Sequence, residues 1–110
     1  MKPTIDLDRQ KNLLSIHIPA DLTSTSVREF QAAILGAMLV PEGSVAPWQT
    51  VALHLTAAKM VDSMGLNLII KILKIAQAAG GRMQVIYHDP NVHRTLLFTR
   101  LDRHVELVKG

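Results

Sequence analysis

The turn that organises this chain reads Val61-Asp62-Ser63-Met64-Gly65-Leu66. Before it, apolar residues at 51, 53 and 55 predict a strand, and its nearly continuous apolar character is typical of a central strand in a parallel sheet. After it, apolar residues recur at helical spacing until about Ala79, where Gly80-Gly81 predicts a C-terminal cap. Asp62 stands at the predicted N-cap, because its carboxylate can accept hydrogen bonds from the first backbone N–H groups.

The rest of the chain alternates strand and helix signals on both sides of this turn. Strands are predicted at about 5–7, 13–18, 83–88 and 105–108, and helices at about 26–39 and after Asp89-Pro90. Thr23-Ser24-Thr25-Ser26 offers several N-cap candidates for the first helix, and Ser26, followed three residues later by Glu29, fits a capping box. The 41–50 segment is expected to be a loop, with Trp48 folded back over an edge of the core.

This order of elements, β-β-α-β-α-β-α-β, predicts an α/β fold. We expect a single domain over residues 1–110, with a mixed sheet of four to five strands and helices packed on one face. The composition, 48% apolar and 19% charged, is sufficient to bury one core. Because the chain has no Cys, the fold cannot rely on disulfides or a thiolate metal site, which fits a reducing cytoplasm.

The composition also argues against two classes of partner. No apolar run approaches the roughly 20 residues that span a bilayer, and the N-terminus lacks the apolar stretch of a signal peptide, so we expect a cytoplasmic protein without membrane insertion. The net charge is +3, but the basic residues are scattered among acidic ones, and no aromatic stacking platform is visible. We therefore expect no binding to nucleic acid.

With this order of elements, the chain resembles the STAS-domain family and, within it, the anti-sigma-factor antagonists. The resemblance is clearest from 51 to 107, and the turn Asp-Ser-x-Gly-Leu after an apolar strand is its most specific part. The supporting pieces are Val51-Ala52-Leu53-His54-Leu55, Ala79-Gly80-Gly81 and Phe98-Thr99-Arg100-Leu101. The resemblance implies binding to an anti-sigma factor that is also a serine kinase, with release when the turn is phosphorylated.

The resemblance assigns roles at the turn position by position. Asp62 matches the acid of the family's turn and Ser63 its first hydroxyl. Met64 stands where the family usually carries the phosphoacceptor, and Gly65 matches the glycine that follows. Because Met64 cannot be phosphorylated, Ser63 becomes the phosphorylation candidate; its alternative role is to help cap the helix. Without the resemblance, Asp62 is an ordinary cap and Gly65 a site of close helix-to-strand packing.

The helix after the turn carries more apolar residues than one face requires. A 3.6-residue projection assigns Leu66, Ile69, Ile70, Leu73 and Ala76 to the core. It places Met64, Leu68, Ile72, Ile75 and Ala79 nearly opposite, as an outward stripe. Our hypothesis is that Met64, Leu68, Ile72 and Ile75 form an apolar contact with the regulatory partner or with a second copy. The alternative is that the 41–50 loop, with Trp48, folds over the stripe.

Five histidines raise the question of catalysis or metal binding. His17 and His54 are expected side by side on neighbouring strands, and His88 and His93 flank a turn, but neither pair has a recognised ligand spacing. No base is positioned for Ser63, and the glycine pair lies at the end of a helix rather than at its start. The sequence predicts neither an enzyme nor a metal or cofactor site.

The sequence predicts a protein-interaction module of bacterial signalling and transcription regulation that acts by partner switching. The expected partner is an anti-sigma factor/serine kinase-like protein, and a homodimer is a further possibility. The expected partner-binding residues are Asp21, Thr23, Asp62, Ser63, Met64, Gly65, Asn67, Leu68, Ile72 and Ile75. The alternatives are a STAS subunit of a phospholipid-transport ABC complex that binds its ATPase, and a component of a stress-sensing scaffold.

Overall fold

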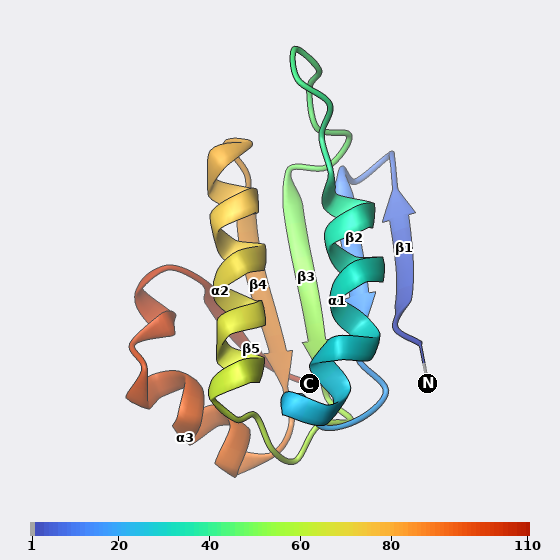
Figure 1. The fold of residues 1–110 in the computed structure, drawn as a ribbon. Coiled ribbons are helices and arrows are strands. Elements are labelled where there is room, and N and C mark those ends of the chain that lie inside the picture. The colour runs from blue at the N-terminus through green and yellow to red at the C-terminus, as the bar shows by residue number, and fades with distance from the viewer. Residues whose placement is uncertain (1) are drawn as a thin grey trace.

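A computed structural model describes residues 2–110, in which five strands form one mixed sheet. The strands are β1 (Thr4–Asp8), β2 (Leu13–His17), β3 (Thr50–Leu55), β4 (Arg82–Tyr87) and β5 (Glu106–Lys109). Their order across the sheet is the order of the chain; β1 runs antiparallel to β2, and the remaining pairs are parallel (Figure 1). The predicted α/β class with a mixed sheet is confirmed.

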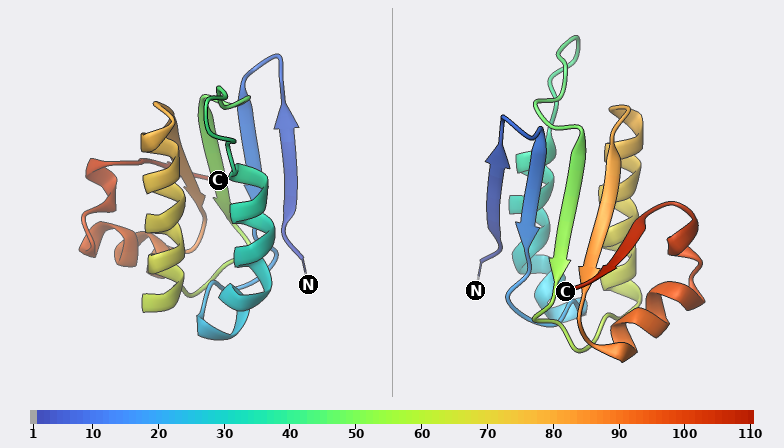
Figure 2. Two further views of the ribbon diagram at one scale, coloured as in Figure 1. Left: turned by 45° about the horizontal axis from the view of Figure 1, so that its top comes forward. Right: turned by 180° about the vertical axis from the view of Figure 1, so that it is seen from behind.

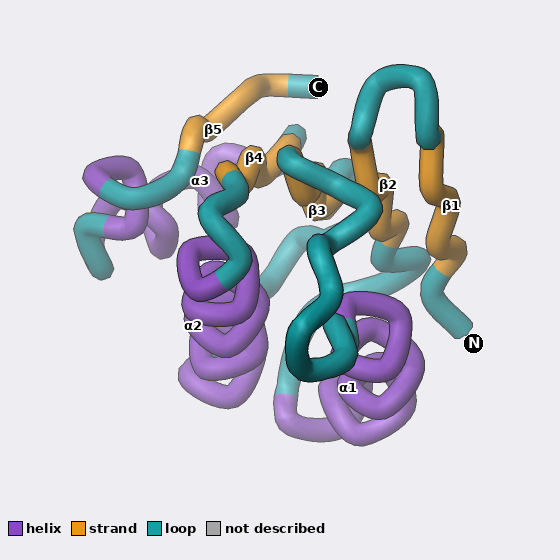
Figure 3. Tube along the Cα trace, turned by 90° about the horizontal axis from the view of Figure 1, so that it is seen from above, coloured by secondary structure: helices purple, strands orange, loops and turns teal. Residues whose placement is uncertain are grey.

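The helices form a layer on one face of this sheet. Helices α1 (Ser24–Met38) and α2 (Ser63–Ala78) lie side by side over the central strands, and the opposite face carries no helix (Figures 2 and 3). Helix α3 (Pro90–Phe98) and the 3₁₀ turn η1 (Leu101–Arg103) lie beside the β5 end of the sheet. Asp89 caps α3 by accepting a hydrogen bond from the Asn91 N–H at 2.8 Å, as Asp89-Pro90 predicted.

Strand register places the apolar residues beneath α1 and α2. Ile16 on β2 pairs with Leu53 on β3, which pairs with Val85 on β4, and all three side chains are fully buried. The neighbouring positions point to the bare face, where His17 pairs with His54. The helical layer therefore covers one side of a sheet whose other side is partly polar.

The predicted outward stripe on α2 is wrong for two of its residues. Leu68 and Ile72 are 1% and 0% exposed, whereas Met64 is 47% exposed and Ile75 is half-buried. The reason is that α2 packs against α1 as well as against the sheet, so it buries a wider part of its circumference than a single-contact helix. Leu66 and Ile70, which were expected in the core, are only half-buried and pack against its edge.

Trp48 is buried as expected, but the 41–50 loop reaches only the far end of the α2 stripe, where its residues 41–46 line a groove with Ile75 and Ala79. Its indole lies at the glycine pair after α2, where a Cβ on Gly81 would be 3.2 Å from the ring. Residues 41–45 are exposed and extend beyond the end of the sheet (Figure 1). Burial of Leu68 and Ile72 therefore comes from α1 rather than from the loop.

The capping box of α1 differs from the prediction. The N-cap is Thr23, one of the candidates predicted in 23–26, and the helix begins at Ser24. The Ser26 hydroxyl accepts a hydrogen bond from the Thr23 N–H at 2.9 Å and donates one to the Asp21 carbonyl at 2.6 Å. Ser26 thus fills the third position of the capping box, which the sequence prediction gave to Glu29.

Candidate functional site

Two loops meet where parallel strands β2 and β3 end. We call residues 21–25 and 59–67 the loop pair. They are joined as a short parallel bridge between Leu22 and Val61. The Leu22 N–H donates to the Met60 carbonyl at 3.0 Å, and the Asp62 N–H donates to the Leu22 carbonyl at 3.2 Å. The backbones of the two loops are therefore joined directly to each other.

Within the loop pair, the Asp62 carboxylate accepts hydrogen bonds from the first turns of both α1 and α2. Its Oδ1 accepts a hydrogen bond from the Gly65 N–H at 3.0 Å, as the predicted N-cap of α2. Its Oδ2 accepts one from the Ser24 N–H at 2.8 Å, at the first residue of α1. The sequence predicted the first bond but not the second, because Ser24 is 38 residues away in the chain.

These hydrogen bonds favour the ionised carboxylate. The Gly65 N–H, and after it the Ser24 N–H, lower the pKa of Asp62 below its usual value, against a smaller opposing effect of burial. The positive ends of two helix dipoles meet at the same group. Asp62 therefore holds a fixed negative charge at the centre of the loop pair at neutral pH.

Gly65 is needed because α2 approaches the other loop closely. A Cβ at this position would lie 2.2 Å from the Leu22 carbonyl oxygen, far inside van der Waals contact. The sequence suggested close packing against a strand, whereas the contact is with the backbone of the α1 loop. The family's glycine thus serves here to bring the two loops together.

The remaining predicted partner-binding residues fall into two groups. One lies at the exposed end of the loop pair, which we call the tip, and the other is buried below it or lies further along α2. Asp21 supports the tip by accepting a hydrogen bond from the Lys59 N–H at 2.7 Å. Exposed side chains at the tip come from Ser63, Met64 and Asn67, and Thr23 is half-buried beside them. Leu68 and Ile72 are buried below the tip, and Ile75 lies near the far end of α2, so these three do not belong to the tip surface.

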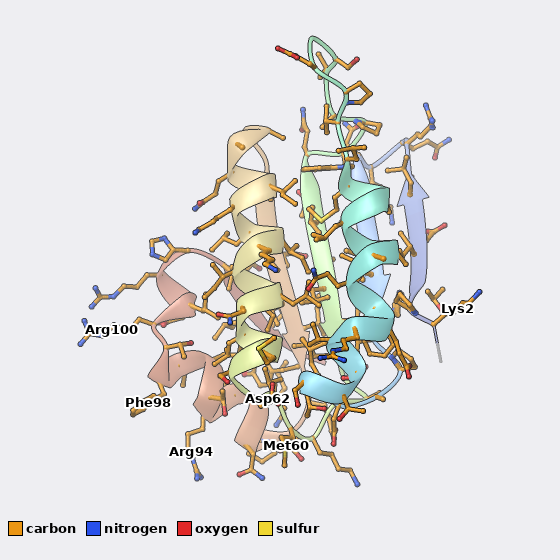
Figure 4. All side chains as sticks on the ribbon, in the orientation of Figure 1. Lys2, Met60, Asp62, Arg94, Phe98 and Arg100 are labelled. Carbon is orange, nitrogen blue, oxygen red and sulfur yellow. The ribbon has the colours of Figure 1, made fainter. Side chains whose placement is uncertain are left out.

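Met60 is the tip residue that sequence reasoning missed. It is 57% exposed and lies at the same end of the molecule as Asp62 (Figure 4). Its carbonyl is held by Leu22, so its side chain stands on a fixed backbone. No periodicity marks a loop residue as exposed or buried, which is why only the structure shows that Met60 is exposed at the end of the molecule where Asp62 lies.

Three of the five histidines make stacked ring contacts. His17 and His54 stack on the bare face with ring centroids 4.1 Å apart, as their expected neighbouring positions allowed, and Tyr87 stacks on His93 at 4.2 Å. Burial, and secondarily the charge of His17, lowers the pKa of His54. Among residues 2–110, no three His, Cys, Asp or Glu side chains are grouped so that they could hold a metal ion.

Comparisons with known proteins agree with this geometry. The STAS domain model matches residues 4–109, and the chain therefore belongs to the STAS domain family. No curated protein sequence gives a significant match. Within the part of the chain that the structure describes, no helix has the length and apolar character needed to cross a membrane.

Three solved structures illustrate the similarity of the fold. A STAS domain protein from Planctomyces limnophilus has a TM-score of 0.82 at 18% identity, covering 100% of this chain and 92% of that one. A putative anti-sigma factor antagonist from Thermotoga maritima has a TM-score of 0.71 at 20% identity, with coverages of 98% and 86%. The phosphorylated form of SpoIIAA, a Bacillus cell fate determinant, has a TM-score of 0.70 at 17% identity, with coverages of 98% and 90%. At these identities the likeness establishes the fold alone.

Proposed function

We propose that this chain is a non-catalytic interaction module of bacterial signalling in the cytoplasm. Its loop pair docks an anti-sigma factor/serine kinase-like partner, in the manner of an anti-sigma-factor antagonist. The observation that carries the proposal is the Asp62 carboxylate, which bonds to the N-termini of both helices and holds an exposed tip in one conformation. Membership of the STAS family supports the assignment of this tip as the docking surface.

Rigid presentation of the tip favours binding. A surface that is already ordered loses less conformational entropy when a partner docks. Met60 and Met64 add flexible, polarisable side chains that can adapt to an apolar partner surface. The loop pair therefore combines a fixed backbone with adaptable contacts.

We further propose that release does not depend on phosphorylation at position 64. A phosphate there would add roughly two negative charges to the contact, but a thioether cannot carry one. Ser63 is exposed at the first residue of α2 and is the remaining candidate for modification. In this proposal, either the chain is no longer released by phosphorylation, or the phosphorylated residue is Ser63 instead of residue 64.

Binding to a purified anti-sigma factor/serine kinase-like protein from the same organism tests the docking surface. Met64→Asp places a charge in the proposed contact and should weaken binding at least about tenfold, as for a central interface residue. Gln10→Asp adds the same charge to an exposed residue of the β1–β2 turn, at the other end of the sheet, and should leave binding unchanged. Normal binding by folded Met64→Asp would contradict the proposal.

Intact mass measurement after incubation with the kinase and ATP tests the switch. We expect no phosphate on the wild type and one phosphate on Met64→Ser, which restores a hydroxyl at the family's position. A phosphate on the wild type that disappears in Ser63→Ala would place the switch at Ser63 instead.

A second candidate function is favoured by the same Met64 side chain. A contact that phosphorylation cannot release would suit a STAS subunit that permanently binds the ATPase of a phospholipid-transport complex. Transporter genes beside this gene, and binding of that ATPase in place of the kinase-like protein, would favour this alternative.

A further inference from the structure

An apolar groove lies at the end of the molecule opposite the loop pair. It has a volume of about 690 Å³ and opens between the C-terminal ends of α1 and α2 and the segment 39–46. We call it the end groove. Its apolar lining comes from Leu35, Met38, Leu39, Val40, Val45, Ala46 and Ile75, among others. Val45 is 92% exposed, so much of this apolar surface faces solvent.

The end groove carries one formal negative charge and lies at the partially negative ends of two helices. Among the described residues that line it, Glu42 is the only charged one. Both α1 and α2 end there, and their last turns, which the structure describes completely, carry no basic side chain to balance the partial negative charge of the helix ends. An occupant should therefore be apolar with basic groups around it.

Such a group exists on the chain itself. Phe98 is 87% exposed at the last residue of α3, and Leu97 beside it is also exposed. Arg94 and Arg100 project on the same side, away from the body of the molecule (Figure 4). We call Arg94, Leu97, Phe98 and Arg100 the α3 knob.

We propose that the α3 knob of one copy inserts Phe98 into the end groove of a second copy. Helix α3, which carries the knob, and the segment 39–46, which lines the groove, lie at opposite ends of the molecule in Figure 1, so the knob and the groove of one copy do not meet. Both surfaces are apolar, and the arginines of the knob are opposite in charge to Glu42 and to the partial negative charge of the helix C-termini at the groove.

The arrangement determines the kind of assembly. A contact between two different surfaces is heterologous, so each copy offers one knob and one groove, and copies add head to tail. A single aromatic anchor and one groove form a smaller contact than a standard stable interface. We therefore expect reversible association with a dissociation constant of about 10 μM to 1 mM.

A two-fold contact between two end grooves is less favourable. It would bring the Glu42 carboxylates of both copies to the same contact, and it would leave both α3 knobs exposed. This arrangement is one outcome that the following experiment separates from the proposed one.

Sedimentation velocity across about 10 μM to 1 mM tests the proposal. The average sedimentation coefficient of the wild type should rise with protein concentration and fall when salt is added, since salt screens the arginine contacts. Phe98→Asp removes the knob, and Val45→Lys places a positive charge in the groove. Both residues are exposed, so both variants should fold, and each should reduce the association constant at least about tenfold.

Mixing the two variants gives the decisive measurement. Phe98→Asp retains an intact groove and Val45→Lys retains an intact knob, so an equimolar mixture should form one-to-one dimers and nothing larger. Met60→Asp changes an exposed apolar residue of the loop pair and should associate like the wild type. This control separates failure here from failure of the proposed partner docking.

Three results would overturn the proposal. A wild type that stays monomeric at about 1 mM has no such contact. Undiminished association of Phe98→Asp alone would point to the groove-to-groove arrangement, and undiminished association of Val45→Lys alone would point to a contact between two knobs.

Discussion

At the scale of single residues, Asp62 and Gly65 bring the two loops together. Asp62 accepts hydrogen bonds from both helix N-termini, and Gly65 allows α2 to approach the Leu22 carbonyl. The sequence indicated both residues, because a cap and a glycine next to a helix start have recognisable local signals. It did not indicate their partners, which come from a loop 38 residues earlier in the chain.

Replacement of Gly65 by alanine tests this close approach. Because the new Cβ would meet the Leu22 carbonyl oxygen at 2.2 Å, Gly65→Ala should lower the free energy of unfolding by about 1–3 kcal/mol. Gly36→Ala is the matched control: that Cβ meets nothing within 4 Å inside α1, so the free energy of unfolding should rise by about 0.5–1 kcal/mol. Urea denaturation measures both, and equal effects would contradict the contact.

The stacked histidines give the fold a dependence on pH. The pKa of His54 is lowered, first by burial and second by His17, so the neutral ring stabilises the folded state above the ordinary value of 6.5. This contribution is lost as the pH falls through the lower folded pKa, because the unfolded chain takes up the proton more readily. The thermal midpoint should therefore fall on acidification from about pH 7.5 to 5.

Substitution of His54 separates this effect from other acid-sensitive groups. His54→Asn should reduce the fall in the thermal midpoint, and His17→Asn should reduce it less, since the charge of His17 is the smaller cause. Scanning calorimetry at a series of pH values measures the difference. A pH dependence in His54→Asn identical to that of the wild type would rule out this explanation.

At the scale of elements, α2 shows where periodicity is insufficient. The apolar positions of the helix were correctly identified, but a projection does not say how many neighbours the helix packs against. Leu68 and Ile72 were placed outward because a single sheet contact was assumed, and α1 supplies the second contact. The same lack of tertiary information explains the capping box predicted for α1, where Ser26 matched a cap pattern locally but serves Thr23.

Truncation along α2 distinguishes the buried from the exposed residues. Leu68→Ala should lower the free energy of unfolding by about 2–5 kcal/mol, because it leaves a cavity between α2 and its neighbours. Met64→Ala, on the same predicted stripe but 47% exposed, should change it by no more than about 0.5 kcal/mol. Urea denaturation monitored by circular dichroism compares them; similar losses in both would place Met64 in the core.

At the scale of the whole molecule, the architecture was predictable and the surfaces were not. Alternating strand and helix signals fixed the element order, and the rules for parallel connections allow few arrangements of it. Which side of the sheet stays bare, how the 39–46 segment extends and where Met60 and Phe98 emerge depend on packing between distant segments. These surface features carry the proposed interactions, so function was less predictable than fold.

Trp48 provides a test of cooperative unfolding across the molecule. It is the only tryptophan of the chain, and it is buried where the loop before β3 meets the glycine pair after α2. If the sheet and helices share one core, Trp48 fluorescence and far-ultraviolet circular dichroism should give the same urea midpoint. Separate midpoints would show that this end of the molecule unfolds independently.

The order of the strands has a consequence for biosynthesis. Since β1 to β5 occupy the sheet in the sequence in which a ribosome delivers them, no finished pair has to part to admit a later strand. The β1–β2 hairpin can form first, and each crossover then adds the next strand to a single growing edge. Assembly during translation can thus proceed in one direction, since every new strand joins the edge opposite β1.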